Sequence, residues 1–186
     1  MSTTFVETPG LVAGTWNIDP THSEVGFVVR HLMVSKVRGN FTSFEGSITI
    51  GEDPLQSSVE ASIDAASIDT REPQRDNHLR STDFFDVETH PKITFRSTSV
   101  RPDGGDFVVT GDLTIHGVTR SVDLELEHNG VHPDPWGGQR AGFSAATEIS
   151  RSDFAIDFNV PLDGGGVVIG DKIKITLEVE AVLQQA

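Results

Sequence analysis

The stretch Thr21-His-Ser-Glu-Val-Gly-Phe-Val-Val-Arg-His31 indicates the fold more strongly than any other part of the chain. Successive side chains of a strand point to opposite faces, so Val25, Phe27, Val29 and His31 share one face. The opposite face carries His22, Glu24 and Arg30, with Gly26 and Val28 as its non-polar members. A strand with one apolar and one wet face is typical of antiparallel sheet. This stretch therefore predicts a wall strand with one side directed at a hydrophobic interior.

The same alternation recurs along most of the chain, and turn residues such as Asp103-Gly-Gly105 and His116-Gly117 separate the alternating runs. Several runs are about twice as long as a usual strand. Together they predict an all-β, antiparallel protein of about eight strands. The expected strands are residues 14–19 merging into 22–32, then 37–50, 57–68, 92–100, 106–115, 118–128, 140–150 and 171–182.

Long strands with one apolar face can close into a barrel or stack as a sandwich. An eight-stranded barrel has an interior that side chains fill or that holds one slim ligand. In a sandwich, the two inner faces fill each other. Alternation alone leaves both arrangements open. A narrow barrel lined by Val, Ile, Leu and Phe would suit a linear apolar molecule.

One segment, residues 71–85, breaks the strand pattern and predicts a short inserted helix. Pro73 suits the first turn of a helix, because proline lacks the amide hydrogen that this position leaves unused. Leu79, Phe84 and Phe85 would then pack onto one open end of the barrel. We predict that the insert plugs this end.

Composition limits the classes of partner. The 186 residues carry 14 Lys and Arg against 28 Asp and Glu, a net charge of −14, with no cysteine. Such a surface repels nucleic acid and anionic bilayers over roughly 10 Å. No apolar run approaches the ~20 residues of a membrane span, so neither nucleic acid nor stable membrane insertion is expected. We predict one domain, residues 12–183, behind a tail of residues 1–11; without a visible secretory signal, the expected compartment is the cytoplasm.

A local exception to the acidic charge lies between Glu24 and Glu45, where the chain has no acidic residue but has Arg30, Lys36 and Arg38. One interpretation is a solvated turn whose long side-chain stems lie on the barrel rim. The other is a mouth at which Lys36 and Arg38 meet a polar or anionic head group.

Motifs for catalysis and metal binding are missing. There is no cysteine nucleophile and no Gly-x-Ser-x-Gly turn. His128 and His132 are four residues apart, but Asn129-Gly130 places a turn between them, so they do not match helical metal-ligand spacing. We therefore expect no metal, no catalytic residue and no cofactor. His31 has the parity of an inward residue near the rim, where it could hydrogen-bond a head group or a backbone carbonyl.

Short pieces spread over about residues 14–182 resemble the YceI-like family, bacterial lipid-binding proteins with a lipocalin-like barrel. Individually these pieces are weak, but all of them occur in family order. They are Trp16-Asn-Ile-Asp19, His22-Ser-Glu-Val-Gly-Phe27, His31-Leu-Met-Val-Ser-Lys-Val-Arg-Gly39 with Phe41, His78-Leu-Arg-Ser-Thr-Asp-Phe-Phe-Asp86, Pro91-Lys-Ile-Thr-Phe95, Gly111-Asp-Leu-Thr-Ile-His-Gly-Val-Thr119 and Arg151-Ser-Asp-Phe154.

The resemblance implies an eight-stranded antiparallel barrel that holds a polyisoprenoid, an isoprenoid quinone or a fatty-acid-like molecule. It also implies homodimers and no established catalysis. We therefore predict a protein that binds and carries a long apolar chain in its lumen. Two alternatives stay open: an enzyme acting on a lipid substrate in the same cavity, and a filled barrel that binds only a protein partner.

Parity and the matched pieces together give the predicted ligand-binding residues. Those assigned to the lumen are Val25, Phe27, Val29, His31, Phe41, Phe95 and Phe143. Those assigned to the mouth are Leu32, Met33 and Val34, with Lys36 and Arg38 as the head-group pair.

Overall fold

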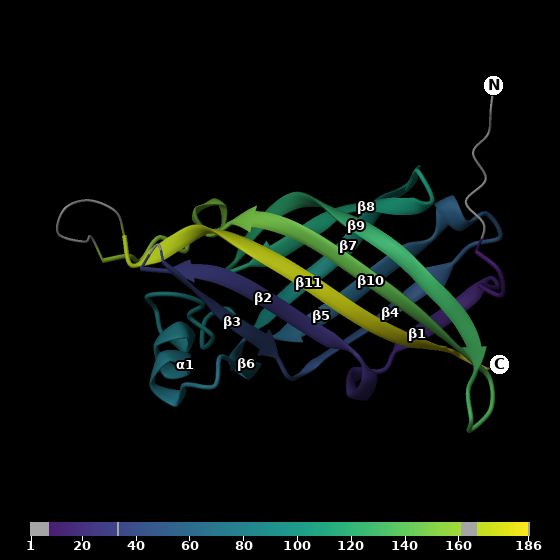
Figure 1. Cartoon of the computed structure of the whole chain (residues 1–186), viewed down its shortest axis with the longest axis horizontal. Coiled ribbons are helices and arrows are strands. Elements are labelled where there is room, and N and C mark those ends of the chain that lie inside the picture. Colours follow the sequence, from purple (N-terminus) through teal and green to yellow (C-terminus); the bar gives the residue numbers. More distant parts are fainter. Residues whose placement is uncertain (1–7, 33, 161–166, 186) are drawn as a thin grey trace.

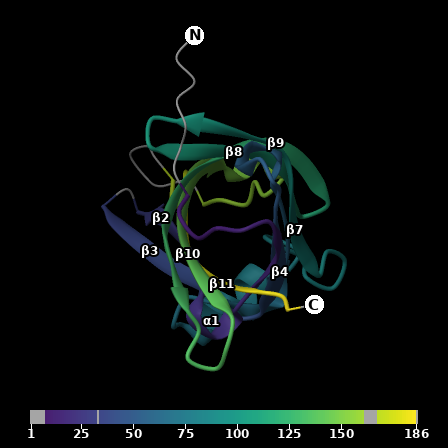
Figure 2. The ribbon, with the colours of Figure 1, turned by 90° about the vertical axis from the view of Figure 1, so that its right-hand side faces the viewer.

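The computed structural model describes residues 8–32, 34–160 and 167–185. One antiparallel sheet curls into a barrel (Figures 1 and 2). Its strands are β1 (Gly14–Ile18), β2 (Glu24–His31), β3 (Ser35–Phe41), β4 (Phe44–Ile50), β5 (Ser58–Asp64), β6 (Ile68–Asp69), β7 (Lys92–Asp103), β8 (Asp106–Ile115), β9 (Val118–Pro133), β10 (Gln139–Ser150) and β11 (Ile169–Leu183). The helical elements are α1 (Pro73–Arg80) and the 3-10 helices η1 (Pro20–His22), η2 (Pro54–Gln56), η3 (Ala65–Ser67) and η4 (Arg151–Phe154).

Eight of these strands form a closed ring. Their order is β1–β4–β5–β7–β8–β9–β10–β11, and β11 pairs again with β1. Trp16 of β1 lies opposite Ile48 of β4 on one side and Leu183 of β11 on the other. The prediction of an eight-stranded antiparallel barrel with one short helix is confirmed, and a sandwich is excluded because this sheet has no free edge in the ring.

The last strand has two partners on the same side. Residues 181–183 at the end of β11 pair with β1, whereas residues 169–178 pair with β2. The two partners are neighbours in the chain, separated by η1, where Pro20 and a hydrogen bond from the Thr21 amide to the Asp19 carboxylate turn the backbone. Strands β2, β3 and β6 thus extend the barrel wall along the part of β11 that β1 does not pair with.

The prediction of one strand over residues 37–50 is wrong. The structure has two strands, β3 and β4, with Thr42 and Ser43 between them. The Thr42 amide donates to the Ser67 carbonyl at 3.2 Å, and the Asp64 amide donates to the Ser43 carbonyl at 2.9 Å, so η3 holds the turn. No glycine or proline marks this position, which is why the alternation pattern ran through it.

The barrel has two different ends. We call the end that carries α1, η4 and the β2–β3 hairpin the helix end, and the end near the N- and C-terminal labels of Figure 1 the termini end. At the helix end, a hydrophobic cluster includes Phe41, Phe84 and Phe154. At the termini end, a second cluster surrounds Trp16, which is fully buried and donates from its indole nitrogen to the Val12 carbonyl at 3.1 Å.

The insert at the helix end is built as a plug. Pro73 begins α1, and the Glu72 side chain accepts from the Gln74 amide. Asp76 is buried and accepts hydrogen bonds from both the amide and the hydroxyl of Thr70, which fixes the helix against the chain that leads into it. Phe85 packs edge-on against Phe41 of β3, with ring centres 5.9 Å apart. As predicted, Leu79, Phe84 and Phe85 pack into the hydrophobic cluster at this end of the barrel.

A candidate ligand cavity inside the barrel

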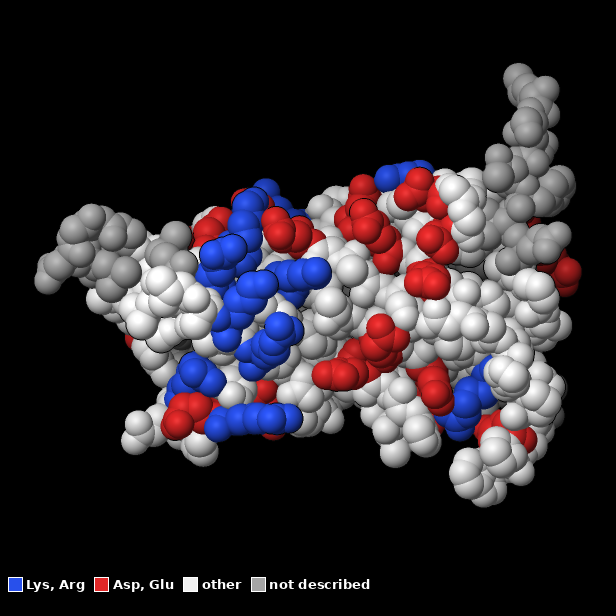
Figure 3. All heavy atoms as spheres, in the orientation of Figure 1, with Lys and Arg blue, Asp and Glu red and all other residues white. Residues whose placement is uncertain are grey.

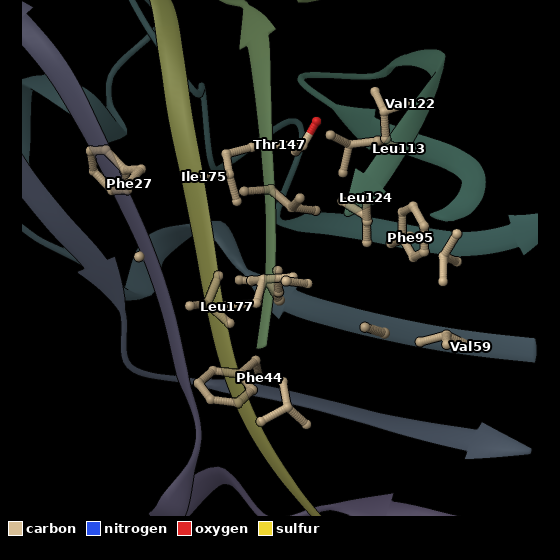
Figure 4. A pocket seen from close by; sticks show the side chains of 18 of the residues that line it. Phe27, Phe44, Val59, Phe95, Leu113, Val122, Leu124, Thr147, Ile175 and Leu177 are labelled. Atoms are coloured by element: carbon tan, nitrogen blue, oxygen red, sulfur yellow. The ribbon is translucent and has the colours of Figure 1, made fainter. Parts of the chain in front are cut away.

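The barrel encloses a cavity of about 290 Å³. Residues from both ends line it, from Leu11 near the termini end to Phe84 and Phe154 at the helix end, so it follows the barrel axis. Figure 4 shows Phe27, Phe44 and other labelled side chains entering this space from strands on different sides. Small-molecule pockets have volumes of roughly 300–1,000 Å³. The cavity is therefore at the slim end of the range for an organic ligand.

Strand alternation accounts for the lining. Along each regular stretch of a ring strand the residues of one parity face inward and the others face outward, and a bulge such as that at residues 97–99 of β7 exchanges the two parities. The inward residues of three long runs illustrate this: Val59, Ala61 and Ile63 of β5, Val122, Leu124 and Leu126 of β9, and Ile173, Ile175, Leu177 and Val179 of β11. The lumen surface is consequently almost entirely carbon. Such a surface binds apolar groups and offers water no hydrogen-bonding partner.

Two glycines determine how large aromatic rings lie on this wall. A Cβ on Gly39 would stand 2.4 Å from Cζ of Phe27, and a Cβ on Gly111 would stand 2.4 Å from Cζ of Phe95. Real atoms do not approach this closely. Each phenylalanine ring can therefore lie against the backbone of a neighbouring strand only because that position has no side chain.

Six of the predicted lumen residues line the cavity. They are Val25, Phe27, Val29, Phe41, Phe95 and Phe143. Their contact with a ligand remains a prediction, since the lining shows only that they border the space. Phe44, Phe107 and most of the aliphatic residues on β8 to β11 also border the cavity. The predicted set did not include them, although the alternation of the strands would have selected them.

The remaining predicted residues lie elsewhere. His31 does not line the cavity; it pairs with Ser35 and Ile169 at the base of the β2–β3 hairpin. Leu32 and Val34 are exposed at the tip of that hairpin. Met33 lies outside the described residues. Their role at a mouth stays a prediction.

Lys36 and Arg38 do not face the lumen. Both are exposed on β3, whereas Val37 between them is half-buried. They lie on the outer wall of the barrel near the helix end, so their predicted role with a head group applies to a ligand that projects beyond the lumen.

Arg151 is a buried cation beside the cavity that sequence reasoning did not single out. Its guanidinium donates to the carbonyls of Ile156 and Phe158 at 2.9 Å each, and to that of Gly170 at 2.9 Å. Burial lowers the pKa of Arg151. Because backbone carbonyls accept its N–H hydrogens, this arginine holds irregular backbone together at the helix end. It does not present its charge to the lumen.

His128 also borders the cavity. Its ring lies 5.2 Å from that of Phe143, and burial lowers its pKa, so the ring is neutral at neutral pH. Its Nε2 is buried and has no hydrogen-bond partner among the described residues. Parity could have placed His128 in the lumen, because it continues the inward series of Leu124 and Leu126.

A group that could hold a metal ion lies outside the cavity lining. Ligand atoms of Asp86, His90 and His116 are all within 4.8 Å of one another. The His116 Nδ1 is 3.2 Å from the Phe154 carbonyl, which would leave Nε2 free for a metal. The three residues come from the turn before β7 and from the β8–β9 hairpin. The sequence showed no metal-ligand spacing here because the fold brings them together.

These features define a class: a closed antiparallel barrel around an apolar cavity of ligand size. Within the described part of the chain, no helix combines the length and apolarity that crossing a bilayer requires.

The comparisons identify the family. A profile for the YceI-like domain matches residues 16–181, and the chain belongs to this family. Protein YceI of Escherichia coli (strain UMN026) is 41% identical over 177 residues, which cover 94% of this chain and 90% of that protein. The family resemblance seen in the sequence is confirmed.

Solved structures agree with this assignment. BcnA of Burkholderia cenocepacia superposes with a TM-score of 0.75 at 26% identity, covering 89% of this chain and 99% of that one. The YceI protein of Campylobacter jejuni gives a TM-score of 0.72 at 31% identity, covering 84% and 90%. A domain from Saccharophagus degradans described as polyisoprenoid-binding gives 0.69 at 17% identity, covering 93% and 100%; at this identity it shows the fold alone.

Proposed function

We propose that this protein binds and carries one long apolar chain, such as an isoprenoid quinone, a polyprenyl lipid or a fatty-acid-like molecule, in its lumen. The observation that carries the proposal is the axial cavity of about 290 Å³ with a carbon surface. Burial of apolar area stabilises a complex by about 25 cal/mol per Å². A chain lying along the axis would bury most of its length.

The shape of the cavity favours a linear ligand. Its lining extends through the barrel from one end to the other, whereas its volume is small for a pocket of that length. The Saccharophagus degradans domain of the same fold is described as polyisoprenoid-binding, so isoprenoid chains are the first ligands to test. A homodimer is part of the proposal on family resemblance alone.

The rival function is an enzyme that acts on a lipid in the same cavity. Catalysis needs an acid, base or nucleophile within reach of the reacting atoms. The histidine beside the lumen, His128, has its Nε2 covered, and the Arg151 hydrogens are used by carbonyls. This distribution of polar atoms supports carriage. Conversion of a bound lipid during incubation, lost in His128→Ala, would favour the enzyme.

Native mass spectrometry of the freshly purified protein tests the proposal directly. We expect a protein peak heavier by the mass of one lipid, which organic extraction removes and identifies, and the same spectrum reports the oligomeric state. A protein without bound lipid that also fails to take up added isoprenoid or fatty acid would overturn the proposal.

A matched pair of variants locates the ligand. Ala145 faces the lumen between Leu126 and Leu177, whereas the next residue, Ala146, lies on the opposite face of β10. Ala145→Trp should fill the cavity and weaken binding of a long-chain fluorescent lipid by about ten-fold or more, because it removes ligand area from burial. Ala146→Trp should leave binding unchanged. Equal effects of the two substitutions would place the ligand outside the lumen.

A further inference from the structure

A patch of positive charge lies on the outer wall near the helix end. It consists of Arg30, Lys36, Arg38, Lys172 and Lys174, all exposed. Arg30 of β2 lies directly opposite Lys36 of β3, and Val28 of β2 separates Lys174 of β11 from Arg38 of β3. Figure 3 shows blue side chains gathered over this part of the barrel, whereas red ones spread over the rest of the face. We call these five residues the basic patch.

The basic patch is unusual for this chain. It holds five of the 14 Lys and Arg residues, in a protein with 28 acidic ones. Among the described residues none of the five forms an ion pair, whereas Lys92, Arg96, Arg101 and Arg140 each do. Glu148, opposite Lys174 on β10, borders the patch. Arg30 and Lys36 are like charges directly opposite each other, which lowers the stability of a sheet, so the fold alone gives no reason for this pair.

Exposed apolar side chains stand beside the patch. The hairpin between Arg30 and Lys36 carries Leu32, 41% exposed, and Val34, 87% exposed. Val160, 46% exposed, is close to them, because the Leu32 amide donates to the Val168 carbonyl and the Val168 amide donates to the Val160 carbonyl. We call Leu32, Val34 and Val160 the apolar tip.

We propose that the basic patch and the apolar tip together dock the barrel on a lipid bilayer with anionic head groups. Apolar side chains that enter the head-group boundary, with cations beside them, are the standard composition of a surface that binds such a membrane peripherally. The apolar tip protrudes at a hairpin turn and is not recessed as a groove for an acidic peptide would be. The proposal goes beyond ligand binding in the lumen, since it concerns the membrane with which a carrier would exchange its cargo.

The net charge of −14 does not oppose this docking. Charges interact through water over about 8 Å at physiological salt. The electrostatic interaction with a bilayer that touches the basic patch is therefore determined by the local cations. Salt screens the acidic residues on the remaining surface from that bilayer. The net charge would instead orient the barrel, because only one region is attracted to an anionic surface.

Co-sedimentation with vesicles tests the proposal. The wild-type protein should bind vesicles of phosphatidylcholine mixed with phosphatidylglycerol, should ignore phosphatidylcholine alone, and should dissociate as salt is raised. Lys36→Glu combined with Arg38→Glu should weaken binding to the anionic vesicles by about ten-fold or more. Val34→Asp should weaken it less.

Two controls separate the patch from net charge and from general stickiness. Arg96→Glu with Arg101→Glu changes the net charge by the same amount on exposed residues of β7 outside the patch, and should leave binding within about two-fold of wild type. Trp136, 85% exposed on the β9–β10 loop, is the most exposed large apolar side chain outside the apolar tip among the described residues. It lies beside Asp134, whose carboxylate accepts from its amide, so Trp136→Ala should have no effect on anionic vesicles.

Three results would overturn the docking proposal: wild-type protein that ignores anionic vesicles, wild-type protein that binds neutral ones equally well, and equal losses in the two double variants. None of these outcomes bears on ligand binding in the lumen. Lipid detected in the wild-type barrel by native mass spectrometry would leave the proposed function standing even if docking failed.

Discussion

Each end of the barrel is held together by an arginine, but the two arginines have different hydrogen-bonding partners. At the helix end, Arg151 donates to backbone carbonyls of chain that has no regular structure, and burial disfavours its charge. At the termini end, Arg140 lies 2.7 Å from Asp19, 3.1 Å from Glu180 and 3.3 Å from Asp134. Carbonyls do not titrate in the accessible range, whereas carboxylates do. The two ends of the barrel should therefore respond differently to mutation and to acid.

The largest expected effect is at the helix end. Arg151→Met should lower the free energy of unfolding by about 3 kcal/mol, because several buried carbonyls lose their donor at once. Arg151→Lys should recover little of this loss, since one ammonium cannot reach the same set of acceptors. Urea unfolding followed by circular dichroism measures both variants. A loss no larger than that of Arg140→Met would show that the helix end does not depend on this arginine.

The termini end should be less sensitive at neutral pH and more sensitive in acid. Arg140→Met should cost about 1–2 kcal/mol, because the pairs are only partly buried. The Arg140 guanidinium, followed by His22, holds the pKa of Asp19 well below its ordinary value of 3.8. A lowered carboxyl pKa gives stability that is present above the ordinary value and is lost as the pH falls below it.

Unfolding of wild type and Arg140→Met at a series of pH values tests this difference. The wild type should lose stability as the pH drops below about 4, and the variant should show a shallower loss. Parallel curves for the two proteins would contradict the assignment of the acid response to this cluster.

The third expected effect concerns the wall between the ends, and it should be smaller than that of Arg151→Met. Gly111→Ala would place a methyl group against both the Phe95 ring and the Arg96 carbonyl oxygen, and we expect a loss of about 1–2 kcal/mol together with weaker lipid binding as the ring moves into the lumen. Gly39→Ala should act similarly through Phe27. Gly105 has nothing within 4 Å of the added carbon, so Gly105→Ala should change neither quantity. A fluorescent-lipid titration and thermal unfolding of the three variants separate these outcomes.

The sequence predicted the parts of the molecule that depend on local pattern. Alternation identified the inward faces of the strands, and the insert after Pro73 was expected to cover an end. The break between Phe41 and Phe44 was missed because Thr42 and Ser43 carry no turn signal, and their partners in η3 come from another part of the chain. The role of Arg151 was missed for the same reason, since its acceptors become neighbours only when the barrel closes.

The candidate site likewise has a part that the local sequence pattern predicts and a part that it does not. Parity correctly indicates which residues border the lumen, as it does for Phe27 and Phe95. It does not indicate where an individual strand ends relative to the cavity, so His31 was assigned to the lumen although it lies at the base of a hairpin. The clustering of Lys172 and Lys174 with Arg38 depends on the pairing of β11 with β2, which connects residues far apart in sequence.

The double pairing of β11 determines when the barrel can close during synthesis of the chain. This strand follows the other seven ring strands in the chain, so it leaves the ribosome after them. Until then, β10 on one side and β1 with β2 on the other expose unsatisfied backbone edges that invite pairing with another chain. Closure of the barrel must therefore await synthesis of β11, and the nascent protein is most vulnerable to aggregation just before that strand emerges.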